Sequence, residues 1–155
     1  AAVRIAEDAL TRSPKDPKRL WHLSKARLWA GQCERAIELM TQVIKLDPRD
    51  PAADLLFNMS YCLFMTGENK AAVDWMLKAK DKNPHWSETH ALLAMAYAKL
   101  GDMDRSRAAR DALLRAEPAY NPSRWNGTTL EQMNSFDREM WDTVRPAWRL
   151  ANLPE

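Results

Sequence analysis

The chain has 155 residues, a length that fits one domain and can bury roughly 70% of the surface that the unfolded chain would expose. It carries 23 Lys and Arg against 21 Asp and Glu, and a net charge of +2 argues against a domain that binds nucleic acid through phosphate contacts. No run approaches the roughly 20 apolar residues of a membrane span, and the start lacks the pattern of a signal peptide. We therefore expect a cytoplasmic protein with no membrane segment in this piece.

The first element, residues 1–14, has the sequence AAVRIAEDALTRSP and places apolar residues at helical spacing without a capping residue in front. Ala2 precedes Ala36 by the same interval that separates Pro14 from Pro48. We interpret this stretch as the second helix of a repeated unit that is cut at residue 1. We expect the first helix of that unit, and a domain that the array regulates, to precede it.

Glycine and proline recur at a fixed interval in the next part of the chain. Three glycines are each followed by a proline at the same distance, in the pairs Gly31 and Pro48, Gly67 and Pro84, and Gly101 and Pro118. Successive glycines are about 35 residues apart, a period typical of helical solenoids. The units are 17–50, 51–86 and 87–120, with residues 51 and 52 lengthening the second by two.

Each unit contains two apolar stripes at helical spacing, one before the glycine and one after it, so each is predicted to be helix, tight turn, helix. Small residues mark where the two backbones must approach: Ser24, Ser60 and Ala94 on the first helices, and Ala36, Ala72 and Ser106 on the second. The glycines suit the left-handed position that ends a helix. The expected helix starts are Asp16-Pro17, Asp50-Pro51 and Ser87-Glu88.

This pattern resembles the tetratricopeptide repeat (TPR). The resemblance rests on the period, on the small residue and aromatic in AMAYAKLGD (residues 94–102), on the alanine after the turn and on the closing proline. It implies an all-α, right-handed superhelical solenoid. Arg27 departs from the pattern because an aromatic residue is usual there, and Ser106 and Arg110 weaken the last stripe.

The resemblance also implies a protein-interaction module whose concave face is lined by the first helices. Residues one step along from the core stripe should form an apolar and aromatic groove for an amphipathic helix or an extended apolar segment. An apolar face of this size is rarely open to water, so the chain's own tail or a second copy could also fill it. The expected groove residues are Trp21, Lys25, Leu28, Trp29, Phe57, Tyr61, Phe64, Met65, Met95 and Lys99.

The tail, residues 121–155, begins with a break in the pattern at NPSRWNGTT. Trp141, Val144, Trp148 and Ala151 then recur at helical spacing, which predicts a helix over 137–152 that caps the third unit. The ending LANLPE resembles the close of helical-repeat tails in bacterial class III adenylate and guanylate cyclases and in some winged-helix regulators.

That second resemblance favours the C-terminal regulatory fragment of a larger bacterial signalling protein. It implies no active site in these residues. Two alternatives stay open: a free-standing assembly or scaffold factor, and an enzyme fragment whose chemistry lies in the missing N-terminal part. The partner would be a protein or peptide, another domain of the same protein, or a second copy of the chain.

The residues with catalytic or metal-binding side chains do not assemble into a motif. Cys33 and Cys62 lie in different apolar segments without CxxC spacing, so we expect reduced core residues. His85 and His90 are five apart, and His22 belongs to another unit. The arginines of residues 105–115 alternate with aspartates, which indicates a mixed solvated face. We therefore predict no catalytic residue, metal or cofactor, and no enzyme activity in this piece.

Overall fold

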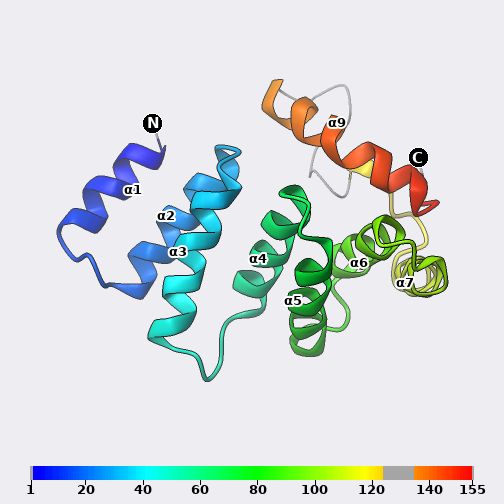
Figure 1. Ribbon diagram of the computed structural model, residues 1–155, viewed down its shortest axis with the longest axis horizontal. Helices are drawn as coiled ribbons and strands as arrows, with labels where there is room; N and C mark the ends of the chain where they lie inside the picture. The colour runs from blue at the N-terminus through cyan, green and yellow to red at the C-terminus, as the bar shows by residue number, and fades with distance from the viewer. Residues whose placement is uncertain (1, 124–134, 155) are drawn as a thin grey trace. The chain divides into compact units, whose positions relative to one another are not determined.

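The computed structural model describes residues 2–123 and 135–154, and every regular element in those residues is helical (Figure 1), as the sequence predicts. The chain divides into two compact units, Ala1–Ala79 and Lys80–Glu155, and α5 crosses the boundary between them. The helices are α1 (Ala2–Thr11), α2 (Pro17–Trp29), α3 (Cys33–Leu46), α4 (Ala53–Met65), α5 (Asn69–Lys82), α6 (Ser87–Lys99), α7 (Met103–Ala116) and α9 (Ser135–Leu150).

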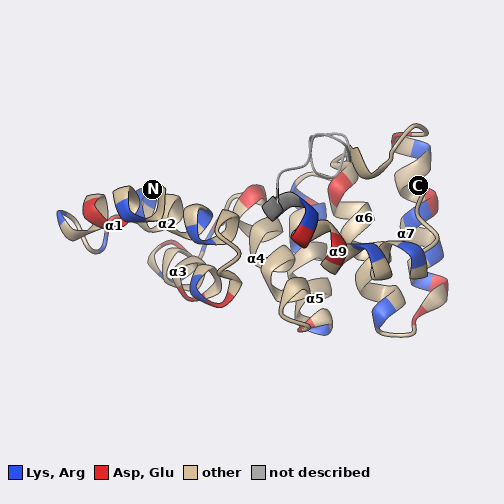
Figure 2. Cartoon of the chain, turned by 90° about the horizontal axis from the view of Figure 1, so that it is seen from above, with Lys and Arg blue, Asp and Glu red and all other residues tan. Residues whose placement is uncertain are grey.

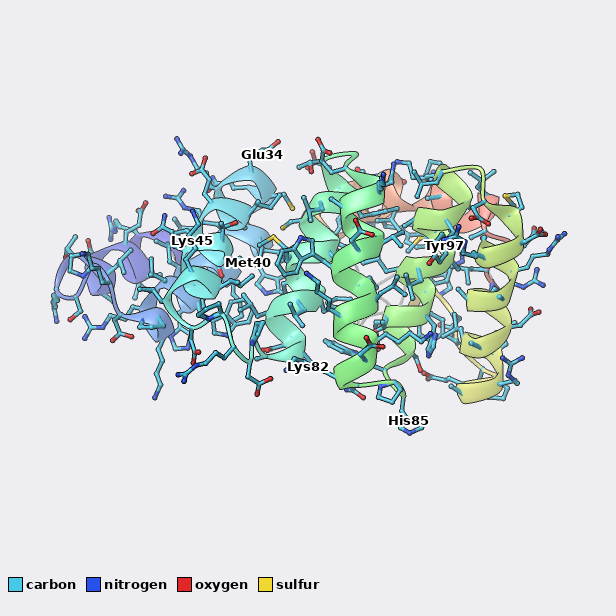
Figure 3. All side chains as sticks on the ribbon, turned by 60° about the horizontal axis from the view of Figure 1, so that its bottom comes forward. Glu34, Met40, Lys45, Lys82, His85 and Tyr97 are labelled. Carbon is cyan, nitrogen blue, oxygen red and sulfur yellow. The ribbon has the colours of Figure 1, made fainter. Side chains whose placement is uncertain are left out.

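The first unit is built around α2. This helix packs on α1, α3 and α4, and α3 also packs on α4. Leu20 and Leu23 of α2, Met40 of α3, and Leu56 and Met59 of α4 are all buried; Figure 3 labels Met40. The predicted apolar stripes thus form the core of this unit.

The three predicted turn glycines all adopt the left-handed conformation, with φ of 73° at Gly31, 88° at Gly67 and 78° at Gly101. After α2, the Gly31 N–H donates to Leu28 O at 2.9 Å and the Gln32 N–H donates to Arg27 O at 2.9 Å. The same pair of bonds recurs after α4 and α6. This is the Schellman motif, which satisfies the last carbonyls of a helix and favours a residue without a Cβ at its left-handed position.

The six small residues predicted at the helix crossings are all buried, with at most 1% of their surface exposed. In the second unit, where α6 packs on α7, the Ser106 hydroxyl of α7 donates to Ala94 O of α6 at 2.8 Å. A side-chain hydroxyl can reach the opposite backbone only where the two helices lie close together. The prediction of close backbone approach is confirmed.

Of the three predicted helix starts, only the first is correct. The Asp16 carboxylate accepts from the backbone N–H groups of Lys18 and Arg19, at 2.9 and 3.4 Å, and Pro17 begins α2. The second start is wrong because Ala52, after Pro51, is extended with ψ of 148°, so α4 begins at Ala53. The third is wrong because Ser87 is already helical and Trp86 precedes it, without a capping side chain.

The second unit consists mainly of α6, α7 and α9, and α9 packs on α6. Trp148 is fully buried on α9 and anchors the aromatic contacts of this unit. Its ring stacks on Tyr120 with centroids 5.9 Å apart and meets Trp141 edge-on at 5.3 Å. The predicted tail helix therefore exists, two residues earlier than expected at each end, and its apolar stripe is buried. Most of the predicted break before it lies outside the described residues.

The sequence LANLPE closes α9 with a fourth Schellman motif. Asn152 is left-handed with φ of 54°, its N–H donates to Arg149 O at 3.0 Å, and the Leu153 N–H donates to Trp148 O at 3.1 Å. Leu153 is buried, and the Trp148 indole N–H donates to Pro154 O at 2.9 Å. Asn152, Leu153 and Pro154 therefore have structural roles at the end of this helix.

Candidate protein-binding face

The structure divides the ten predicted groove residues into two classes. Trp29 and Lys99 are exposed, and four others are half-buried, namely Trp21, Lys25, Phe57 and Met65. The remaining four are buried and belong to the core: Leu28, Tyr61, Phe64 and Met95. The first six therefore expose part of their side chains to solvent, whereas the last four expose little or nothing.

Trp21 and Lys25 occupy neighbouring turns of α2. The Lys25 ammonium lies 5.0 Å from the centroid of the Trp21 ring, which is the geometry of a cation–π contact. This contact restrains the indole while leaving it partly exposed. A restrained aromatic side chain loses little conformational entropy when a partner packs against it.

Trp21 also forms one wall of a cavity of about 200 Å³ in the first unit. The cavity lies among the first turns of α2, the end of α3, the connection 47–52 and the start of α4. Its wall is largely apolar, with charged residues among the lining. The lining residues are Pro17, Lys18, Trp21, Val43, Asp47, Asp50, Pro51, Ala52 and Leu55.

Among these lining residues, the sequence pattern predicts only Trp21 as part of a binding groove. The sequence does contain one indication of the cavity. Residues 51 and 52, the two extra residues of the second unit, both line it. They lengthen the connection to 47–52, whereas the equivalent connection between α5 and α6 is 83–86. The irregular repeat length thus marks the cavity.

On α6 the predicted groove positions are covered. Every residue from Thr89 to Ala98 is buried, and α9 packs on this helix. Met95 is fully buried, whereas Lys99, near the helix end, is exposed. Of the three occupants considered for an apolar face, the chain's own tail is therefore the one found on α6.

Arg27, the residue that departs from the repeat pattern, forms polar contacts in the first unit. Its guanidinium pairs with Glu7 of α1 and donates to Gln32 Oε1 at 2.6 Å. The position therefore links α2 to α1 by charge, whereas Tyr97 at the matching position of α6 is buried.

The charged residues of α7 form the mixed face that the sequence indicates. Figure 2 shows basic and acidic segments next to each other on this helix. Arg105 pairs with Asp102 at 2.7 Å, Arg110 pairs with Asp111 at 2.9 Å, and Arg107 pairs with Asp104. Because each of these arginines has a carboxylate neighbour, the helix does not present a concentrated basic patch.

The histidines do not converge on a site. His22 and His85 are exposed, and Figure 3 shows His85 pointing away from the helices. His90 is buried with its Nε2 3.0 Å from Pro84 O, so it packs within the second unit. Among the residues that the structure describes, no three His, Cys, Asp or Glu side chains lie together as metal ligands.

The Tyr61 phenol is buried in the first unit, and burial changes its pKa. It raises the pKa of Tyr61 well above its ordinary value, and charges on the neighbouring Cys33 and Cys62 would raise it further. The phenol therefore stays neutral at physiological pH.

Two models of the tetratricopeptide repeat match the chain, one over residues 30–95 and one over residues 87–120. Together they cover residues 30–120, which contain helices α3 to α7 and the turns at Gly31, Gly67 and Gly101. The chain belongs to the tetratricopeptide repeat family. The turn glycines, the small residues at the helix crossings and the helix pairs of this TPR chain are the features that the family pattern specifies.

Solved structures of TPR proteins are similar to this chain in fold. A crystal structure of MamA has a TM-score of 0.70 at 19% identity, covering 97% of this chain and 84% of that chain. The 41-end form of MamA from Desulfovibrio magneticus RS-1 has a TM-score of 0.71 at 17% identity, covering 97% and 80%. YrrB, described as a TPR protein with an unusual peptide-binding site, has a TM-score of 0.68 at 16% identity, covering 97% and 79%.

A search of curated proteins found no match to this TPR sequence. Among the helices described here, none combines the length and apolar composition that crossing a membrane requires.

Proposed function

We propose that this chain is a non-catalytic TPR scaffold that binds an apolar or amphipathic segment of a protein partner on its first unit. The observation that carries the proposal is the apolar cavity of about 200 Å³ beside the half-buried Trp21. A cavity of this size suits one large aliphatic or aromatic side chain of the partner. Partly exposed Phe57 and Met65 on α4 add further apolar surface in the same unit.

The charges around the cavity favour a partner with polar residues next to its apolar anchor. Lys18, Asp47 and Asp50 contribute to the lining, and Arg49 pairs with Asp47 at 3.7 Å. Both signs are present, so the segment need not be strongly acidic or basic. In interfaces of this kind the buried anchor supplies most of the affinity, and the surrounding charges set orientation.

The comparisons favour a free-standing scaffold over the regulatory fragment of a cyclase. The matched structures are TPR proteins, one of them with a peptide-binding site in its description, and their similarity to this chain extends over nearly its whole length. The cyclase hypothesis rests on LANLPE, and Asn152, Leu153 and Pro154 of this sequence already have structural roles at the end of α9. The sequence of the full-length gene tests the two hypotheses directly.

A displayed library of amphipathic helical peptides provides the probe for the binding proposal. A selected peptide should shift the indole N–H resonance of Trp21, which is assigned by its loss in Trp21→Ala. Trp21→Ala should raise the Kd of that peptide by about 10–100-fold, as expected for an aromatic hot spot. Trp29→Ala is the matched control because Trp29 lies on the same helix, is 62% exposed and does not line the cavity; its Kd should change by less than about 3-fold.

Equal losses in the two variants, or unchanged binding in both, would place the peptide elsewhere and contradict the proposal. Sedimentation of the chain without peptide tests the remaining alternative, which is self-association. Self-association that Trp21→Ala abolishes would make a second copy the occupant of this face.

A further inference from the structure

Two thiols that are far apart in the sequence lie at the same end of a packed helix pair in the first unit. Cys33 is the first residue of α3, and Cys62 lies in the last turn of α4, the helix that packs on α3. Each thiol shifts the pKa of the other, so the two side chains lie close enough to interact. Both are free thiols and both are buried.

The two cysteines belong to different repeats. Cys33 is in the second helix of the unit 17–50, and Cys62 is in the first helix of the next unit. A bond between them would join neighbouring repeats covalently at one end of the α3–α4 pair. The cavity beside Trp21 lies at the other end of this pair, near Val43 and Leu55.

We propose that Cys33 and Cys62 form a reversible disulfide when the protein meets hydrogen peroxide. The inference is independent of the peptide-binding function. The sequence predicts reduced core cysteines because it places them in separate segments without CxxC spacing, whereas the fold brings those two segments together. Cysteines react selectively when a second thiol is close enough to resolve the first oxidation product.

Cys33 is the attacking thiol. It retains 7% of its surface exposed beside the tight turn at Gly31, whereas Cys62 is completely buried. Hydrogen bonding from Cys62 lowers the pKa of Cys33, and the same hydrogen bond together with burial raises the pKa of Cys62. The thiolate therefore forms first at the more accessible sulfur. Peroxide is small enough to reach a sulfur with little exposed surface.

The reaction balances with one peroxide molecule. The Cys33 thiolate attacks a peroxide oxygen, the O–O bond breaks, and hydroxide leaves while an S–O bond forms. The Cys62 sulfur then attacks the Cys33 sulfur, an S–S bond forms, the S–O bond breaks, and the Cys62 proton leaves with the hydroxyl as water. The hydroxide from the first step takes up the proton that the Cys33 thiol released on ionising. The two sulfurs together lose two electrons, and the peroxide is reduced to two molecules of water. A thiol reductant reverses the change by exchange.

Intact-mass spectrometry of the reduced, desalted chain during peroxide titration tests this proposal. The wild type should lose two hydrogen masses while remaining monomeric, and dithiothreitol should restore them. Cys33→Ser and Cys62→Ser are the control variants, with circular dichroism checking their fold. Cys62→Ser should instead gain oxygen at Cys33 and react with dimedone, and Cys33→Ser should stay unmodified at the same peroxide dose.

Thermal melting tests whether the native fold accommodates the bond. Closing a loop of about 30 residues should raise the melting temperature of the oxidised chain by roughly 5–15 °C over the reduced chain. A wild-type chain that keeps both thiols, gains only oxygen, or forms only intermolecular dimers would overturn the proposal. A fall in the melting temperature on cross-linking would do the same.

Discussion

The helices α2 and α6 occupy the same position in their repeats but differ in how they meet solvent. On α2, four residues are buried, and Trp21 and Lys25 remain partly accessible. On α6, ten consecutive residues from Thr89 to Ala98 are buried, and α9 packs on the helix. Positions equivalent to Trp21 and Lys25 are Ala91 and Met95, which are fully buried.

This difference shows that repeat position alone does not define a binding surface. A first helix can support binding only where a neighbouring element leaves its face accessible. In the second unit the tail occupies that face with its own apolar stripe. In the first unit the longer connection 47–52 lies beside a cavity that the half-buried Trp21 ring helps to line. We therefore expect matched substitutions on the two helices to differ in their effect on the free energy of unfolding.

Removing α9 should have the largest effect. Deletion of residues 135–155 exposes the apolar face of α6 and removes the buried Trp141, Val144 and Trp148. Loss of one buried aromatic side chain alone costs about 3–5 kcal/mol. We expect a large fall in the melting temperature or aggregation of the truncated chain, measured by calorimetry and light scattering. Melting unchanged from that of the full chain would show that α9 is not a cap.

Matched substitutions on α6 and α2 should give an intermediate effect. Met95→Ala removes a fully buried side chain and should cost about 2–5 kcal/mol of unfolding free energy. Lys25→Ala at the equivalent position of α2 changes a half-buried side chain and should cost less than about 0.5 kcal/mol. Urea denaturation of both variants measures the difference. Similar costs at the two positions would contradict the contrast between the helices.

The smallest effect is expected at Arg27. Arg27→Ala removes the ion pair with the partly exposed Glu7 and the bond to Gln32, at a cost of about 1 kcal/mol or less. The cost should shrink in concentrated NaCl because partly exposed charges are screened. A double-mutant cycle with Glu7→Ala isolates the pair. A coupling energy that does not respond to salt would indicate that Arg27 acts through the packing of its side-chain stem.

The turns and helix crossings could be predicted because each depends on a local requirement. Gly31, Gly67 and Gly101 are the left-handed residues of their turns, and Ser106 and Ala94 meet because small side chains permit close approach. These requirements repeat with the period of the sequence. The helix starts at Ala53 and Ser87 were harder to place because neither is marked by a capping side chain.

The accessible face was only partly predictable because accessibility depends on what packs over each helix. The sequence pattern assigns Met95 and Lys25 to equivalent positions of their repeats. Met95 is buried and Lys25 is half-buried, a difference that follows from the packing of α9 on α6. The proximity of Cys33 and Cys62 depends in the same way on helix packing. The cavity beside Trp21 left a sequence signal, the two extra residues at 51 and 52, but repeat length alone does not reveal an opening.

The packing of α9 on α6 also bears on how the protein is made. Most contacts of a helical repeat lie within a hairpin or between neighbours, so they can form as soon as each unit leaves the ribosome. The contact with α9 cannot, because α9 is synthesised well after α6. In the interval the apolar face of α6 is open to other chains, and this is the stage of synthesis at which aggregation and chaperone binding should be greatest.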